Sequence, residues 1–134
     1  MSIQDIWLDT ALCFIGGAWV DPAARQTLEL GNPSTGEVIC LIARGQQDDI
    51  DRAVSAAQEA LQGPWARMTA PERGRILAKI GQLVLENADT LARLEAIDVG
   101  KPLKQAKADA LALARYMEFY GGAADKLHGH TIPY

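Results

Sequence analysis

The stretch of residues 69–102 constrains the fold of this chain more than any other part of the sequence. Thr69 and Glu72 have the spacing of a capping box, and Pro71 between them suits the first turn of a helix. Apolar side chains then recur at the spacing of one helix face: Ile76, Leu77, Ile80, Leu83 and Val84. A helix this long and this one-sided needs another part of the protein to cover its apolar face.

This helical stretch is expected to be bent or broken near its middle. Asn87 and Asp89 interrupt the apolar face, and either side chain could cap a second helical segment. The same spacing resumes with Leu91, Leu94 and Ile97. Gly100 followed by Pro102 then stops the helix, because glycine becomes left-handed easily and proline cannot continue a helix.

Short strands are predicted in the first third of the chain. Residues 13–20 contain two strand-like pieces around a Gly-Gly pair, and residues 27–30 alternate in a way that could pair back antiparallel. Residues 32–36, Asn-Pro-Ser-Thr-Gly, have the composition of a tight turn. Residues 38–43 are a continuous apolar run, which favours a strand covered on both faces.

Two further helical stretches flank the first one. Asp48 and Asp49 lie in the expected first turn of the earlier stretch, where the helix dipole favours acidic side chains. Its apolar face consists of Ile50, Ala53, Val54, Ala57 and Leu61. Trp65 follows it as an expected packing anchor, and the last stretch runs from about Leu103 to Leu127. The fold class indicated is α+β, with short strands followed by three helical stretches.

The composition argues against several classes of function. The formal net charge is −4 and the basic residues are scattered, which argues against non-specific nucleic-acid binding. The sequence has no apolar run near the roughly 20 residues of a membrane span. Residues 1–12 lack Lys and Arg, so they do not have the form of a secretory signal, and the two cysteines suggest a reducing compartment. We expect a cytoplasmic protein without a nucleic-acid or membrane partner.

The candidate chemical groups are few. Cys13 and Cys40 lie in apolar strand-like runs without a nearby His, which favours buried structural thiols over nucleophiles or a disulfide. His128 and His130 have no accompanying Cys or carboxylate cluster, which favours surface loop residues over metal ligands. The two Gly-Gly pairs lack the strand–turn–helix setting of a phosphate loop. These residues predict no catalytic and no cofactor-binding residue in the chain.

A series of motifs follows one order along the chain. They are FIGGAWV (residues 14–20), NPSTGEVI (32–39), Trp65 with PER (71–73), LEAIDVGKP (94–102) and YGGAADKLHG (120–129). Their order and spacing resemble the N-terminal part of an NAD(P)-dependent aldehyde dehydrogenase. The resemblance implies a parent α/β fold with a Rossmann-type cofactor domain, of which residues 1–134 form the first portion. The implied layout is an arm at 1–12, strands at 13–44, helices at 46–129 and an extended end at 130–134.

The resemblance also implies an activity for the full-length enzyme. That activity is oxidation of an aldehyde to a carboxylic acid with NAD or NADP, through attack by a cysteine thiolate. The family's catalytic cysteine and glutamate lie beyond Tyr134, and neither Cys13 nor Cys40 matches the nucleophile's motif. We therefore expect a scaffolding role, no activity or bound cofactor in this chain alone, and assembly with the remainder of the chain as a homodimer or homotetramer. The alternative is a non-catalytic helical interaction module.

One residue of the chain has a possible ligand role. Asp98 is expected in the last turn of a helix, near the negative end of the helix dipole. It could be solvated or paired with Lys101. The resemblance implies instead a monovalent cation held by Asp98 and by the backbone carbonyls near Leu30 and Gly31.

Overall fold

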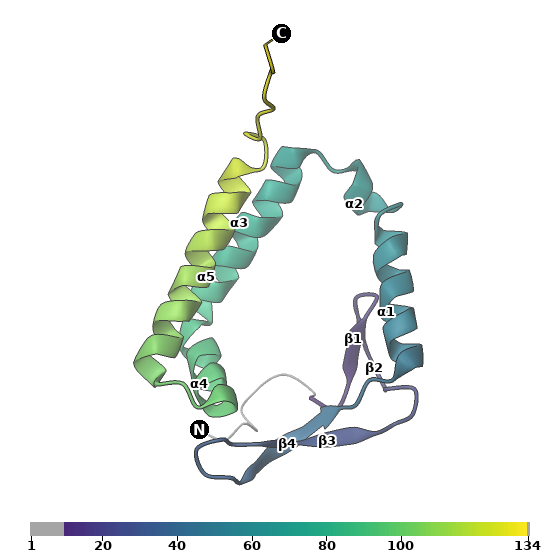
Figure 1. The fold of residues 1–134 in the computed structure, drawn as a ribbon, viewed down its shortest axis with the longest axis vertical. Helices are drawn as coiled ribbons and strands as arrows, with labels where there is room; N and C mark the ends of the chain where they lie inside the picture. The colour runs from purple at the N-terminus through teal and green to yellow at the C-terminus, as the bar shows by residue number, and fades with distance from the viewer. Residues whose placement is uncertain (1–9, 134) are drawn as a thin grey trace. The chain divides into compact units, whose positions relative to one another are not determined.

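The computed structural model describes residues 10–133 as an α+β chain of short strands followed by helices, as the sequence predicts (Figure 1). Its elements are β1 (Cys13–Ile15), β2 (Ala18–Val20), β3 (Thr27–Gly31), β4 (Val38–Ala43), α1 (Gln47–Ala60), α2 (Pro64–Arg67), α3 (Ala70–Glu86), α4 (Ala88–Val99) and α5 (Leu103–Ala123). Two compact units result, one containing residues up to 66 with 94–100, the other 67–93 with 101 onward. Most of the predicted arm, residues 1–9, lies outside the described residues, as does Tyr134.

The strands of the first unit form two antiparallel hairpins. β1 and β2 are joined by Gly16 and Gly17, whose φ angles of 62° and 82° suit a tight hairpin turn. β3 is antiparallel as expected of residues 27–30, but it pairs with β4, the strand that follows it, and not back on the preceding strand. The predicted turn is also confirmed, because Gly36 has a φ of 75° and the Ser34 N–H donates to Asn32 Oδ1 at 2.8 Å.

The prediction that residues 38–43 are covered on both faces is wrong. Val38 and Leu41 remain 56% and 49% exposed. Within the described residues β4 belongs to a sheet of only two strands, and its outer edge is met by Thr10. The Ala43 N–H donates to the Thr10 carbonyl at 2.8 Å, and Thr10 Oγ1 donates to the Leu41 carbonyl at 2.6 Å.

Helix α1 contacts β1 through small side chains. A Cβ built on Gly16 would lie 3.8 Å from Ala56 Cβ, an ordinary van der Waals distance. The larger side chains of the predicted apolar face, Ile50, Val54 and Leu61, are instead 57%, 50% and 62% exposed. Trp65, expected as a packing anchor, is 44% exposed. Periodicity thus found the helix but not the face that it buries in this chain.

Helix α3 begins and ends near the predicted residues. The Thr69 N–H donates to Glu72 Oε2 at 2.7 Å and the Glu72 N–H donates to Thr69 Oγ1 at 3.4 Å, which confirms the capping box. The predicted break is confirmed at Asn87, between α3 and α4. Asn87 Nδ2 donates back to the Leu83 carbonyl at 2.8 Å and so helps to end α3, and a side-chain cap of α4 by Asn87 or Asp89 stays a prediction.

Helices α3 and α5 lie side by side and run antiparallel (Figure 1). Gly74 lies against Gly121, and Gly81 lies against Ala114. A Cβ built on Gly121 would be 2.7 Å from the Gly74 carbonyl oxygen, so the two backbones are in direct contact. The buried apolar side chains of the described helices are all alanines: Ala88 and Ala92 in α4, and Ala106, Ala110 and Ala114 in α5. We call this contact the glycine–alanine seam.

The end of α5 differs from the prediction. The helix ends at Ala123, whereas the sequence pattern placed the end near Leu127. Gly121 and Gly122 lie in its last turn, where each glycine weakens the helix by about 1 kcal/mol relative to alanine. The Lys126 N–H then donates to the Ala123 carbonyl at 2.9 Å in a turn, and residues 126–133 continue without helix or strand.

Two adjacent glycines test the seam. We expect Gly121→Ala to lower the free energy of unfolding by about 1–3 kcal/mol, because its methyl group would press on the backbone of α3. Gly122→Ala is the matched control, since a Cβ there meets nothing within 4 Å. It should raise that free energy by up to about 1 kcal/mol through helix propensity. Urea unfolding followed by circular dichroism measures both, and stabilisation by both variants would contradict the seam.

Candidate functional site

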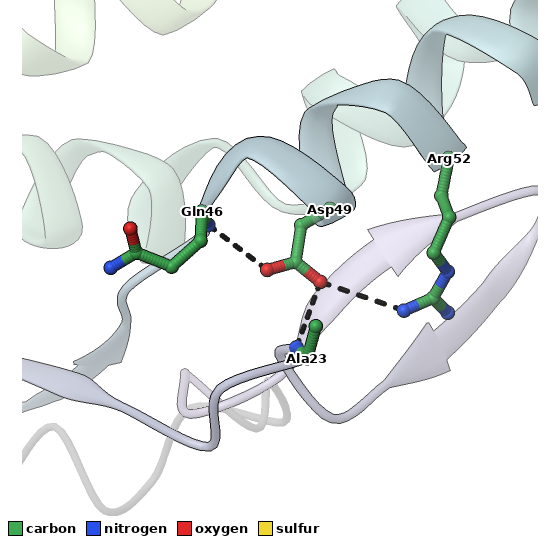
Figure 2. A network of polar contacts seen from close by, with 4 residues as sticks. All are labelled: Ala23, Gln46, Asp49 and Arg52. Carbon is green, nitrogen blue, oxygen red and sulfur yellow. Dashed lines mark hydrogen bonds and ion pairs between the residues drawn. The ribbon is translucent and has the colours of Figure 1, made fainter.

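Asp49 is a buried carboxylate at the start of α1, with 2% of the residue exposed. Figure 2 shows its two oxygens turned toward different partners. The Ala23 N–H donates to Oδ1 at 2.9 Å, and the Gln46 N–H donates to Oδ2 at 3.0 Å. Arg52 Nη1 lies 3.5 Å from Oδ1. One carboxylate therefore ties the loop before β3 to the N-terminus of α1.

The surroundings of Asp49 keep it ionised. The N–H of Gln46 and then that of Ala23 lower its pKa below the ordinary value of 3.8, burial opposes them, and Arg52 adds a smaller lowering. A carboxylate that is ionised and already bonded is suited to holding a loop, not to exchanging protons with a substrate. The sequence indicated only an acid in the first turn. The Gln46–Asp49 spacing, that of a capping box, was the signal for half of this network.

The Thr69 N–H and hydroxyl lower the pKa of Glu72 in the capping box, and the remaining shifted carboxyls belong to surface ion pairs. Lys107 Nζ lies 2.6 Å from Asp89 Oδ1, and Lys101 Nζ donates to Asp109 Oδ2 at 2.6 Å. In each pair the lysine's hydrogen bond is the main cause that lowers the carboxyl pKa. A general acid working near neutral pH needs the opposite shift, toward a raised pKa. These pairs therefore hold α4 and the segment before α5 to α5, and their carboxyls are not suited to acid catalysis.

The structure separates the candidate chemical groups. Cys13 lies in β1 and Cys40 in β4, both as free thiols that are only partly buried, so the expectation of full burial is wrong. His128 and His130 are exposed in the segment after α5. Across residues 10–133, no group of three or more His, Cys, Asp and Glu side chains is arranged to hold a metal ion. In that same range no helix is long and apolar enough to cross a membrane.

Asp98 lies exposed in the last turn of α4, close to the turn that follows β3. Gly100, with a φ of 70°, ends this helix, and a Cβ built on it would be 3.2 Å from Pro33 Cγ. In sequence, Gly100 is two residues from Asp98, and Pro33 is at most three residues from Leu30 and Gly31. All of these residues belong to one compact unit. Asp98 offers a carboxylate, and Leu30 and Gly31 offer backbone carbonyls, which are the types of oxygen donor that hard cations prefer.

A shallow groove lies between the β1–β2 hairpin and α1. Most of the residues that line it are glycines and alanines, among them Gly16, Ala53 and Ala57. Phe14 and Glu59 also line it. Glu59 is the one ionisable residue in that lining. Ligand sites usually combine apolar walls with several convergent polar groups. A single carboxylate at the rim does not provide that arrangement.

The Asp49 network predicts a specific pH dependence. Asp49→Asn should destabilise the chain at neutral pH, because an amide cannot accept both backbone N–H bonds as the carboxylate does. Because the folded-state pKa is lowered, the contribution is complete above the ordinary value of 3.8 and is lost as pH falls through the folded-state pKa. The unfolding free energies of wild type and Asp49→Asn, measured in urea across this range, should converge in acid.

Asp48→Asn is the matched control for this experiment. It removes one negative charge from the same first turn of α1 but leaves the bonds to Ala23 and Gln46 in place. At neutral pH, Asp48→Asn should lower the free energy of unfolding clearly less than Asp49→Asn does. Equal losses in the two variants would assign the effect to the helix dipole alone.

Comparison with known proteins extends the sequence resemblance. Residues 19–134 match the model of the aldehyde dehydrogenase family. Mitochondrial aldehyde dehydrogenase of Rattus norvegicus is 44% identical over 123 residues, which are 90% of this chain and 24% of that protein. Glutarate-semialdehyde dehydrogenase of Pseudomonas aeruginosa is 38% identical over 133 residues, which are 99% of this chain and 27% of that protein.

Solved structures agree with these relatives. The NAD+ complex of an aldehyde dehydrogenase from Bacillus cereus has a TM-score of 0.87 at 38% identity, covering 94% of this chain and 26% of that one. A point mutant of betaine aldehyde dehydrogenase from Staphylococcus aureus, solved with NAD+, has a TM-score of 0.90 at 32% identity, covering 100% and 27%. The chain thus spans about a quarter of the length of the relatives it matches. With a family match over residues 19–134, the chain belongs to the aldehyde dehydrogenase family.

Proposed function

We propose that this chain is the N-terminal segment of an NAD(P)-dependent dehydrogenase that oxidises an aldehyde to a carboxylic acid. The observation that carries this proposal is the continuous match of residues 19–134 to the aldehyde dehydrogenase family. In the whole enzyme the aldehyde and water become a carboxylic acid, and the nicotinamide accepts the hydride. This segment supplies the first portion of the cofactor domain: an arm at 1–12, strands at 13–44, helices at 46–129 and an extended end.

The segment's own residues support a scaffolding role in that reaction. Aldehyde oxidation needs a positioned thiolate and a base that activates water. The thiols of Cys13 and Cys40 lie in strands, and the ionised Asp49 is held by backbone N–H groups. The catalytic cysteine, the glutamate and the cofactor-binding turn belong to the part of the enzyme beyond Tyr134. This segment alone is therefore inactive and binds no dinucleotide.

The remaining features of the proposal concern assembly and location. The cofactor is NAD or NADP, and NAD+ complexes of two structural relatives support the use of NAD. The segment folds with the remainder of its enzyme, which forms a homodimer or homotetramer in the cytoplasm. A second candidate function is a non-catalytic helical interaction module. It is favoured by the exposed apolar side chains of α1, α3 and α5.

A single-chain fusion tests the enzymatic proposal. This chain replaces the matching quarter of the Bacillus cereus aldehyde dehydrogenase, and aldehyde-dependent reduction of NAD or NADP is followed by absorbance. We expect the fusion to turn over and the isolated chain to show no turnover. An inactive fusion that is folded and binds NAD would count against the enzyme and for the interaction module. Turnover by the isolated chain that Cys13→Ser or Cys40→Ser abolishes would assign the nucleophile to this segment.

A monovalent cation at Asp98, Leu30 and Gly31 belongs to the same proposal. An ion that binds the folded state raises stability, so potassium or sodium chloride should raise the melting temperature of the fusion above its value in choline chloride at equal ionic strength. Asp98→Asn should remove this difference, because it removes the carboxylate at the end of α4. Asp51→Asn, on the exposed part of α1, is the control and should retain it. An equal melting temperature in all three salts would rule the cation out.

A further inference from the structure

The C-terminal end of α4 lies against the turn that follows β3. Gly100 ends the helix with a φ of 70°, a left-handed conformation that glycine adopts without strain. A Cβ built on Gly100 would lie 3.2 Å from Pro33 Cγ and 3.4 Å from Ser34 Oγ. Any larger residue at this position would therefore push the proline ring away from the helix end.

The turn on the other side of this contact is held by hydrogen bonds of its own. The Asn32 N–H donates to the Glu37 carbonyl at 2.8 Å, and the Gly36 N–H donates to the Asn32 carbonyl at 2.7 Å. The Ser34 N–H donates to Asn32 Oδ1 at 2.8 Å. Since these bonds tie the turn together, a displacement of Pro33 is passed on to Asn32 and to the strand before it.

The strand before the turn carries the two carbonyls of the proposed cation site. The register between β3 and β4 shifts between Leu30 and Gly31, and an irregularity of this kind changes the direction of backbone groups. On the other side of the contact, Asp98 is two residues before Gly100 in the last turn of α4. The contact between Gly100 and Pro33 therefore joins the two pieces of chain that carry these oxygen donors.

We propose that Gly100 is a positioning residue for the monovalent cation, and that it acts through its contact with Pro33. This inference rests on the proposed function, of which the cation is a part, and it names the residue that determines the affinity for the ion. Gly100 contributes no side chain to the ion and instead holds the α4 end against the turn. Replacing a group that orients metal ligands typically weakens metal binding by about 10–100-fold.

A second left-handed glycine provides the matched control for a test. Gly17 has a φ of 82°, but a Cβ built on it meets nothing within 4 Å. Gly17→Ala and Gly100→Ala therefore introduce the same kind of backbone strain, and only Gly100→Ala presses on a neighbour. Gly100→Ala combined with Pro33→Ala removes the ring atom that the new methyl group would meet, with Pro33→Ala alone as its reference.

Amide hydrogen exchange of peptides from residues 28–37, read by mass spectrometry, measures binding of the ion. The variants are made in the single-chain fusion with the Bacillus cereus enzyme, and potassium or sodium chloride is titrated against choline chloride at constant ionic strength. Protection should rise with ion concentration, and the rise gives the dissociation constant. We expect Gly100→Ala to weaken binding about tenfold or more, Gly17→Ala to leave it unchanged, and the double variant to recover most of the loss.

Each contrary outcome has a distinct meaning. Unchanged ion binding by Gly100→Ala would overturn the role of Gly100 and leave the cation in place, whereas a double variant as weak as Gly100→Ala would overturn the role of the Pro33 contact. If the unaltered fusion shows no ion-dependent protection, the cation and this inference fail together, while aldehyde-dependent turnover still supports the enzyme.

A second variant keeps the test decisive if Gly100→Ala does not fold. Gly100→Asn brings the same Cβ, but asparagine adopts the left-handed conformation more readily than alanine. Exchange of α1 peptides in the same samples reports whether each variant is folded. Gly100→Asn should also bind the ion about tenfold more weakly, and unchanged binding in a folded Gly100→Asn would overturn the proposal.

Discussion

The backbone contact between Gly74 and Gly121 determines how the helices of the second unit can be arranged. A carbonyl oxygen that would lie 2.7 Å from an added Cβ leaves no space for a side chain between the helices. The rest of the contact combines buried alanines such as Ala114 with the first side-chain atoms of larger residues, since a Cβ built on Gly81 would lie 3.2 Å from Met117 Cβ and one on Gly121 3.4 Å from Leu77 Cβ. Close approach of the helices leaves large side chains of the pair exposed, among them Ile80, Leu113 and Tyr116.

The first unit follows the same principle with a different anchor. Here α1 meets the β1–β2 hairpin through alanine, and the buried carboxylate of Asp49 holds the loop before β3 through backbone N–H groups. Hydrogen bonds from backbone N–H groups to an ionised carboxylate are stronger than those between neutral groups, so Asp49 is suited to holding this loop. Ile50 and Val54 on α1 remain about half exposed, so this unit also has apolar surface that it does not cover itself.

Patterns within a few residues predicted the helices, strands and turns well. They predicted poorly which side chains are buried. Thr69 with Glu72, the break at Asn87 and the turn at residues 32–36 all follow from interactions within a few residues, and each was found in sequence. The buried faces could not be found this way, because periodicity assigns the large residues to the core. Ile80 and Val38 are exposed here, whereas Ala106, Ala110 and Ala114 of α5 are buried. The spaced alanines at 106, 110 and 114 were the available signal.

The candidate functional residues show the same difference between what neighbouring residues determine and what depends on residues far apart in the sequence. The proximity of the α4 end to Pro33 joins residues nearly 70 positions apart, and no local pattern in the sequence predicts it; only the family resemblance pointed to Asp98. The lowered carboxyl pKa values arise from caps and ion pairs that hold helices and loops. Large apolar side chains such as Ile50, Val54 and Leu113 remain exposed in a chain that spans about a quarter of the length of the relatives it matches.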